Sequence, residues 1–340
     1  MPYALCPMPG LGMYESFYGF KENPFNLTPD PQFIYLGENH REALAQLIYG
    51  VREKKGFIVL TGEVGTGKTT VVRCFLATLN GGSNNTKAAF LFNPKLSVND
   101  FIQYILRDLG VTTQGGTKGE HLHTLSEFLI DAYKKDEKVV LVVDEAQGLN
   151  PALLEEIRLL SNLETSKSKL LQIVLVGQPE LNQTLSRPNF RQIRQRINLR
   201  HHLPPLTEKE TSEYIEKRLK IAGRKDPIFT KKAVKEIYRR TGGIPRLINV
   251  LCDNSLLVGY ALDRKLINEK IIRESAKDLK LREKPPAIWK WIIPGIAIIG
   301  GLLTYILIEG SRFIGQLYQL LQPIKEISQK GSQFLFGFFK

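Results

Sequence analysis

The stretch with the clearest chemical pattern runs from Thr61 to Thr70 and reads T-G-E-V-G-T-G-K-T-T. It fits the phosphate-loop pattern G-x-x-x-x-G-K-[ST] without a gap. Glycines let successive backbone N–H groups turn inward around phosphates, which side chains would obstruct. Lys68 is expected to reach the β- and γ-phosphates, and the Thr69 hydroxyl to ligate Mg²⁺. The pattern predicts a site for ATP and Mg²⁺ formed by Gly62, Glu63, Val64, Gly65, Thr66, Gly67, Lys68, Thr69 and Thr70.

Two acidic residues, Asp144 and Glu145, directly follow the apolar run Val139–Val143. A continuous β-branched run of this kind is typical of a strand buried on both faces. Acids at the end of such a strand lie at the carboxyl edge of the sheet, where a phosphate loop also lies. We expect Asp144 to hold the Mg²⁺ shell and Glu145 to orient or deprotonate the attacking water. The alternative is that both acids only cap the next helix.

Polar residues near the γ-phosphate are predicted at two further points. Gln178 follows the strand-like run 170–176, from which its side chain would sense the γ-phosphate or its water. Arg246 begins a helix after Gly243 and Pro245, where it would reach back across the cleft to the γ-phosphate. An ordinary helix-start arginine is the alternative for Arg246.

The segment F-R-Q-I-R-Q-R-I carries three arginines, Arg191, Arg194 and Arg196. Guanidinium groups at a subunit boundary would stabilise the transition-state charge on a neighbour's nucleotide. The alternative is a salt-bridged surface helix.

Strand and helix signals alternate as far as residue 203, which predicts a parallel sheet with helices on both faces. Strands are expected at 57–60, 88–92, 139–143 and 170–176, and helices at 98–109, 122–133 and 151–163. From Thr207 the strand signals stop. Thr207 is expected to cap a helix with Glu210 in a capping box, and helices follow at 231–240 and 244–262. These helices predict a lid-sized second domain.

The N-terminal residues fall into two parts. Residues 1–12 contain three prolines and two glycines and are expected to form a flexible leader. From Met13, aromatic residues alternate with turn residues, which predicts an ordered arm packed on a domain. Asn39 is expected to cap a helix that runs to Val51.

The net charge bears on the kind of binding partner, and the cysteine content bears on disulfides, zinc sites and the redox compartment. The 340 residues carry a formal charge of +13, which suits a nucleotide, nucleic acid or an anionic membrane face without choosing among them. Cys6, Cys74 and Cys252 are widely separated and lack C-x-x-C spacing. They argue against a disulfide scaffold or zinc site and fit a reducing compartment.

Several long motifs resemble the AAA+ ATPases of the general secretion pathway protein A family over residues 13–281. They include G-E-V-G-T-G-K-T-T, L-V-V-D-E-A-Q, I-V-L-V-G-Q-P-E-L, G-G-I-P-R-L-I-N-V-L-C-D and the opening M-Y-E-S-F-Y-G-F-K-E-N-P-F. The resemblance implies ring assembly, with Lys68 and Thr69 in Walker A and Asp144 and Glu145 in Walker B. It further implies Gln178 as sensor 1, Arg246 as sensor 2, and Arg191 and Arg196 as preferred arginine fingers, with Arg194 as an alternative.

The segment 287–308 predicts a membrane helix independently of the resemblance. Its uncharged part, 291–308, is near the minimum length that spans a bilayer. Trp289, Trp291 and Tyr305 would mark the interfaces. Lys and Arg are denser on the N-terminal side (Lys270, Arg273, Lys277, Lys280, Arg282 and Lys284) than on the C-terminal side (Arg312 and Lys325). This asymmetry places the ATPase on the cytoplasmic side of a single-pass protein and the tail on the far side. The family resemblance implies that the membrane is the bacterial inner membrane, so the tail would lie in the periplasm. A buried core helix is the alternative.

The resulting prediction is an α/β AAA+ P-loop sheet with a helical lid, followed by one transmembrane helix. Its parts are a leader (1–12), an α/β nucleotide-binding domain (13–203), a lid (204–284), the membrane helix (287–308) and a tail (309–340) that binds the interface or a partner. The family implies a homo-oligomeric ring that acts, with a partner membrane protein, in secretion, pilus or exopolysaccharide export. A DNA-associated ATPase of the transposition-helper type and a non-hydrolysing switch are alternatives. The apolar run argues against nucleic acid as the partner.

Overall fold

The structure is a computed structural model that describes residues 14–281, except 29, 81–84, 93, 114 and 167. Six further residues are described as helical: Ala297, Gly300, Gly301, Thr304, Glu309 and Gln316. The chain divides into two compact units, Met1–Arg282 and Glu283–Lys340. Every strand and helix with assigned bounds in the described residues belongs to the first unit.

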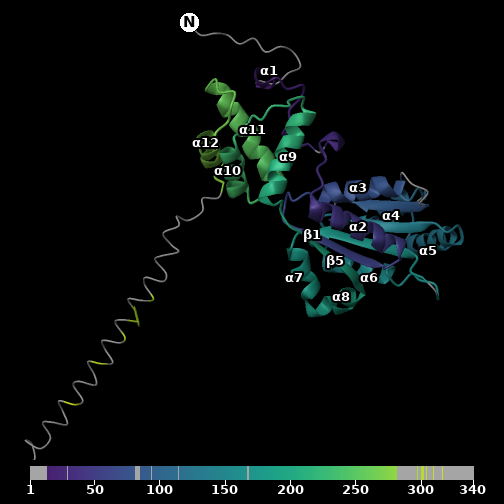
Figure 1. The fold of residues 1–340 in the computed structure, drawn as a ribbon. Helices are drawn as coiled ribbons and strands as arrows, with labels where there is room; N and C mark the ends of the chain where they lie inside the picture. The colour runs from purple at the N-terminus through teal and green to yellow at the C-terminus, as the bar shows by residue number, and fades with distance from the viewer. Residues whose placement is uncertain are drawn as a thin grey trace, which may run out of the picture. The chain divides into compact units, whose positions relative to one another are not determined.

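A five-stranded parallel sheet forms the centre of the first part of this unit (Figure 1). The strands are β1 (Phe57–Gly62), β2 (Thr86–Leu91), β3 (Lys138–Val143), β4 (Leu171–Gly177) and β5 (Ile197–Leu203), in the order β2-β3-β4-β1-β5. Thr61 of β1 pairs with Gly177 of β4, and Val143 of β3 pairs with Leu175. The carboxyl ends of β1, β3 and β4 therefore meet at one edge, as the strand-end argument requires.

The edge strand β5 is not among the strands named from the sequence. Its residues I-N-L-R-H-H-L alternate between half-buried and exposed along most of its length. A strand with one partner and a solvated face does not need the continuous apolar run that identifies β3 and β4.

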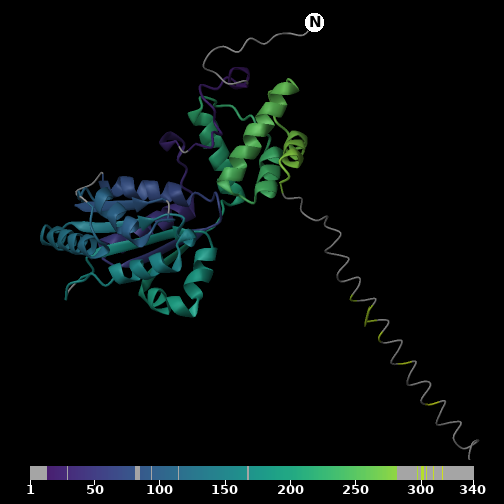
Figure 2. The ribbon, with the colours of Figure 1, turned by 180° about the vertical axis from the view of Figure 1, so that it is seen from behind.

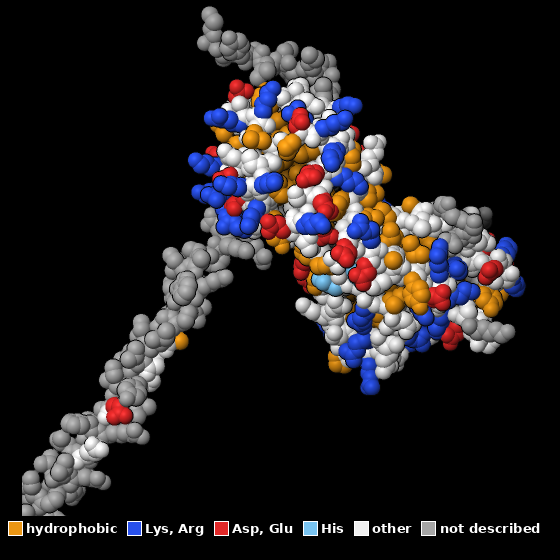
Figure 3. Space-filling view, viewed as in Figure 1, with side chains coloured by type: hydrophobic (Ala, Val, Ile, Leu, Met, Phe, Trp, Pro, Cys, Tyr) orange, Lys and Arg blue, Asp and Glu red, His pale blue; other side chains and the backbone are white. Residues whose placement is uncertain are grey.

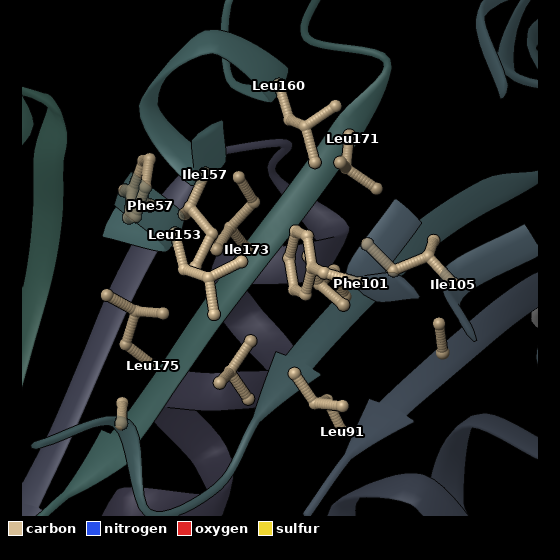
Figure 4. Packing of buried hydrophobic residues seen from close by; sticks show 14 of the residues in the cluster. Phe57, Leu91, Phe101, Ile105, Leu153, Ile157, Leu160, Leu171, Ile173 and Leu175 are labelled. Atoms are coloured by element: carbon tan, nitrogen blue, oxygen red, sulfur yellow. The ribbon is translucent and has the colours of Figure 1, made fainter. Parts of the chain in front are cut away.

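Helices cover both faces of the sheet: α2 (Glu38–Arg52) and α3 (Lys68–Asn80) on one, and α4 (Val98–Asp108), α5 (Lys118–Lys134) and α6 (Pro151–Leu160) on the other. Along β4, Ile173 and Leu175 face the second set, where Phe101 and Leu153 pack on them (Figure 4). The alternate residues Val174 and Val176 face the first set. This alternation buries both faces of the strand and holds its C-terminal edge rigidly in place.

Four helices form the lid: α9 (Glu208–Ile221), α10 (Lys231–Thr241), α11 (Pro245–Ala261) and α12 (Glu269–Asp278). Figure 2 shows them gathered in a bundle. The capping box predicted at Thr207 and Glu210 is confirmed, since each side chain accepts from the other residue's backbone N–H. Two short helices, α7 (Glu180–Ser186) and α8 (Arg191–Arg196), lie between β4 and β5 in the chain.

The N-terminal arm, with its short helix α1 (Glu15–Tyr18), packs into the lid core. The predicted bounds group it with the α/β domain, but Tyr14, Tyr18 and Phe25 are buried among lid side chains. The Tyr18 hydroxyl bonds the carbonyls of Leu256 (3.1 Å) and Arg264 (2.9 Å). These contacts join residues far apart in the chain, which a local sequence pattern does not reveal.

The predicted cap of helix α2 needs correction. The helix begins at Glu38, so Asn39 lies inside its first turn, and the preceding Gly37 offers no side chain. The backbone N–H of Glu38 is instead bonded by the lid residue Glu210 at 2.8 Å. A carboxylate from the second domain thus satisfies a helix N-terminus in the first.

In the described residues, no helix combines the length and the apolar character needed to cross a bilayer. The leader 1–12, the predicted membrane segment 287–308 and the tail 309–340 lie outside the described residues, apart from the six helical positions given above.

Candidate nucleotide-binding site

The loop between β1 and α3 has the backbone that its glycines predict. Gly65 and Gly67 have φ values of +80° and +99°, a region that side chains disfavour. A Cβ on Gly65 would lie 2.6 Å from Cβ of Arg246, so the loop and the lid meet at this glycine. The loop ends at Lys68, the first residue of α3, where free backbone N–H groups favour an anion.

The Lys68 side chain folds back over this loop. Its Nζ donates to the carbonyl oxygens of Gly62 (2.8 Å) and Glu63 (3.0 Å). Burial lowers the pKa of Lys68, against the opposing effect of the Glu145 and Asp144 carboxylates. The ammonium group is thus bonded to the loop and attracted by the two acids at the end of β3. A phosphate chain bound by the loop would lie next to this ammonium group.

The Thr69 hydroxyl donates a 2.9 Å hydrogen bond to Oδ2 of Asp144. Asp144 is buried, and its Oδ1 accepts the backbone N–H of Glu145 at 2.9 Å. A hydroxyl and a carboxylate oxygen held together at a phosphate loop are the donor type that Mg²⁺ prefers. These two residues therefore fit a magnesium ion.

Glu145 and Gln178 meet across neighbouring strands. Nε2 of Gln178 donates to Oε2 of Glu145 at 3.4 Å, and Glu145 has a left-handed backbone with φ of +52°. Gln147 supports both residues. Its Nε2 donates to Oε2 of Glu145, and its Oε1 accepts the backbone N–H of Gln178 at 3.0 Å. Gln147 is absent from the residues named from the sequence, although it stands in the D-E-A-Q motif.

A cavity of about 590 Å³ connects these groups with the arm and the lid. Its size and mixed lining suit a nucleotide. The arm contributes Leu27, Pro31 and Tyr35, the α/β domain contributes His40, Lys68, Thr69, Cys74 and Glu145, and the lid contributes Leu206, Tyr214, Asn249 and Arg246.

Arg246 is a lid residue that contacts the loop. Its backbone N–H donates to the carbonyl of Gly65 at 3.3 Å, and its exposed side chain lines the cavity. The position agrees with a role at the phosphates.

The three arginines of α8 differ in their contacts, and none lines this cavity. Arg196 Nη1 donates to the carbonyl (3.2 Å) and the hydroxyl (2.9 Å) of Ser161. Arg194 Nη1 donates to the Ser186 carbonyl at 3.1 Å. The Arg191 side chain is exposed and makes no hydrogen bond or ion pair within the described residues. No ion pair of the described part supports a salt-bridged α8.

His40, near the start of α2, lines the cavity and contacts the phosphate loop. It is 3% exposed, and its Nε2 lies 2.9 Å from the Thr66 carbonyl in the phosphate loop. Burial lowers the pKa of His40 and so favours the neutral ring. Since the Thr66 carbonyl can only accept, Nε2 carries the proton of this hydrogen bond.

Comparison with known proteins decides the family. A model described as an AAA domain matches residues 51–185. General secretion pathway protein A of Aeromonas hydrophila is 45% identical over 250 residues, which is 73% of this chain and 45% of that protein. The chain belongs to the AAA+ ATPases of the general secretion pathway protein A family. Because the chain spans less than half of that relative, the relative's role in secretion is carried over only as a proposal.

Solved structures agree with an AAA+ fold. The origin recognition complex of Drosophila bound to DNA matches with a TM-score of 0.61 and 16% identity, over 86% of this chain and 73% of that chain. The ORC2 protein of Aeropyrum pernix, in ADPNP–ADP complexes, matches with a TM-score of 0.57 and 19% identity, over 78% and 73%. At these identities the likeness concerns the AAA+ fold alone.

Proposed function

We propose that this AAA+ protein hydrolyses ATP with Mg²⁺ as a membrane-anchored ring that assists assembly of a secretion, pilus or exopolysaccharide export machine. The observation that carries the catalytic part is that Lys68, Thr69 and Glu145 line one cavity. Asp144 and Gln178 stand directly behind it, hydrogen-bonded to Thr69 and Glu145 respectively. Each group has a task in phosphoryl transfer.

The proposed chemistry uses this chain's residues as follows. Lys68 and the loop N–H groups bind the phosphates, and Thr69 and Asp144 hold the metal. When bound there, Mg²⁺ offsets charge on the phosphate oxygens. Glu145 accepts a proton from water as the water oxygen attacks the γ-phosphorus. The bond from the γ-phosphorus to the β–γ bridging oxygen then breaks, which releases ADP and phosphate. Gln147 and Gln178 orient the Glu145 carboxylate.

The ring is supported by the position of Arg191, which is exposed and lies away from the cavity of its own chain. An arginine that serves a nucleotide in a neighbouring subunit needs this placement. The membrane anchor is supported by the uncharged run 291–308 and by the excess of Lys and Arg before it. The export machine is supported by the name of the relative from Aeromonas hydrophila.

ATP turnover of the detergent-solubilised full chain, measured against protein concentration, tests the ring and its chemistry together. We expect turnover per subunit to rise steeply with concentration. Lys68→Ala should abolish nucleotide binding, whereas Glu145→Gln should bind ATP without hydrolysing it. Turnover that is independent of concentration would contradict the ring, and unchanged turnover in Glu145→Gln would contradict the role of Glu145.

The membrane topology is tested separately in cells. A C-terminal epitope should be digested by protease in spheroplasts, whereas an epitope after Met13 should be digested only after lysis. Recovery of the intact protein in a salt-washed soluble fraction would contradict the anchor. Tighter retention on duplex DNA than on anionic vesicles would favour the DNA-associated ATPase instead.

A further inference from the structure

One surface of the lid concentrates positive charge outside the nucleotide cavity. On α10, Lys232, Lys235 and Arg239 are spaced three and four residues apart and so share one helix face. Arg273 and Lys277 extend this face on the neighbouring α12. We call these five exposed residues the basic face. Figure 3 shows Lys and Arg side chains gathered over α10 and α12.

A buried acid organises the basic face from beneath. The Glu236 carboxylate accepts from Arg239 (2.5 and 2.8 Å) and Arg240 (3.0 Å), and Arg273 lies 3.6 Å away. Burial alone would raise the pKa of Glu236, but the hydrogen bonds from Arg239 and Arg240 hold it below its usual value. One carboxylate thus fixes several guanidinium groups without cancelling their summed charge.

The surface above this acid is hollowed. A shallow depression of about 420 Å³ is lined by Lys232, Lys235, Arg239 and Arg273 and by the acids Glu236 and Glu269. Glu274 and Asp278 are the exposed acids of α12. The residues of the basic face outnumber these acids, and Lys231 and Lys270 are further exposed cations of α10 and α12. The geometry suits a dispersed set of anionic groups.

The chain leaves the lid beside this surface. Leu279 and Leu281 pack against the lid core, and the Leu281 N–H donates to the Ala276 carbonyl at 3.0 Å. The chain is therefore held to α12 as far as Leu281. Residues 282–286 separate it from the predicted membrane segment that begins at Ala287. A fully extended chain would cover this gap with about 20 Å, so the lid is tethered close to whatever holds that segment.

We propose that the basic face binds anionic lipid headgroups of the membrane that holds segment 287–308, an inference that rests on the proposed membrane anchor. The lid then lies against the bilayer. Anionic lipid attracts Lys and Arg that come within a Debye length of its surface, about 8 Å at physiological salt. The short tether keeps the face within this range for much of the time, whereas nucleic acid would have to be recruited from solution.

Lysine acetylation of the full chain in nanodiscs tests the contact. Discs of phosphatidylcholine are compared with discs that also contain phosphatidylglycerol, and each lysine is followed by mass spectrometry. We expect Lys232, Lys235 and Lys277 to react at least about threefold more slowly in anionic discs. Salt at about 1 M should remove the difference. The exposed Lys134 of α5 serves as an internal control and should not change. Equal reactivity in both discs would overturn the proposal.

A second measurement distinguishes a lid that does not contact the lipid from a chain that is not anchored in the membrane. The chain has two tryptophans, Trp289 and Trp291, both in the predicted membrane segment. Energy transfer from them to dansyl-labelled lipid therefore reports insertion regardless of the lid. Transfer without protection of the lysines would overturn the lid contact and leave the anchor. Absence of transfer would overturn both.

Two variants and one competitor complete the test. Lys232→Gln/Lys235→Gln should remove the lipid-dependent protection of Lys277, whereas the matched pair Lys134→Gln/Lys135→Gln on the α/β domain should retain it. Protection of the same lysines by a short duplex DNA, but not by anionic lipid, would overturn the proposal in favour of nucleic acid.

Discussion

The carboxylate of Glu210 bonds the backbone N–H of Glu38 at 2.8 Å and so joins the lid to the first turn of α2. Its other oxygen accepts the backbone N–H of Thr207 at 2.9 Å, so one side chain caps two helices from two domains. Gly37 allows the approach, because a Cβ there would lie 2.4 Å from Oε1 of Glu210. Within the same first turn of α2, His40 contacts the Thr66 carbonyl of the phosphate loop. The first turn of α2 thereby links the position of the lid to the position of the phosphate loop.

Removal of this shared cap should affect stability and nucleotide affinity together. Glu210→Ala is expected to lower the free energy of unfolding by about 1–2 kcal/mol, because two helix N-termini lose a charged acceptor. KM for ATP should rise more than kcat falls, since the loop is misplaced before the chemical step. Urea unfolding and steady-state kinetics measure both effects. Glu216→Ala, an exposed change on the same helix, is the control, and an equal loss in that variant would refute the capping role.

The choice among the arginines of α8 can be tested by mixing subunits. Arg191→Ala should leave the unfolding midpoint unchanged, because its side chain makes no hydrogen bond or ion pair in the described residues. Its turnover should fall by about 10³-fold or more if it completes a neighbour's site. Mixing with Glu145→Gln subunits should restore turnover, since each supplies what the other lacks.

Arg196→Ala should behave differently. It removes the bonds to Ser161 and is expected to cost about 1–2 kcal/mol of stability. A variant with normal stability and no turnover, rescued by the same mixing, would transfer the finger role to Arg196.

The Thr69–Asp144 pair should account for the magnesium dependence of binding. With Asp144→Asn, the gain in ATP affinity on adding Mg²⁺ is expected to vanish, whereas weak metal-free binding through Lys68 should persist. Nucleotide titration in EDTA and in excess Mg²⁺ measures this difference. Thr78→Ala, which removes a hydroxyl elsewhere on α3, should keep the full gain. A full gain in Asp144→Asn would place the metal elsewhere.

The buried His40 predicts a pH dependence of stability. Burial lowers the pKa of His40 in the folded protein, and the nearby His201 lowers it further. The hydrogen bond to the Thr66 carbonyl and the charge of Glu210 raise this pKa, but burial has the largest effect. As the pH falls through about 6.5, the unfolded chain takes up this proton first, so the free energy of unfolding decreases. Above that pH the effect is absent. His40→Gln should flatten the decline in urea unfolding, whereas the exposed His123→Gln should not. An unchanged slope in His40→Gln would show that the ring protonates without cost.

The residues at the carboxyl edge of the sheet could be predicted because they follow from local sequence patterns. A phosphate loop between β1 and α3, and acids directly after β3, follow from short runs of residue types and from the rule that parallel strands end together. The contact of Glu210 with Glu38, the packing of the arm in the lid and the strand β5 were not predictable in this way, although the local capping box of Glu210 with Thr207 was. Each depends on a partner distant in the chain, or on an edge position that weakens the apolar pattern. The arginines of α8 look equivalent in sequence, and their contacts, such as those of Arg196 with Ser161, distinguish them only in the fold.

The packing of the arm in the lid core also sets an order of events on the ribosome. The Tyr18 hydroxyl bonds a carbonyl 238 residues further along the chain. At the usual speed of synthesis, the arm emerges on the order of ten to fifty seconds before that partner exists. The sheet is complete once residue 203 is made. We therefore expect the α/β domain to fold first while the aromatic arm is still unpaired, which makes the nascent chain a candidate for chaperone binding until α11 emerges.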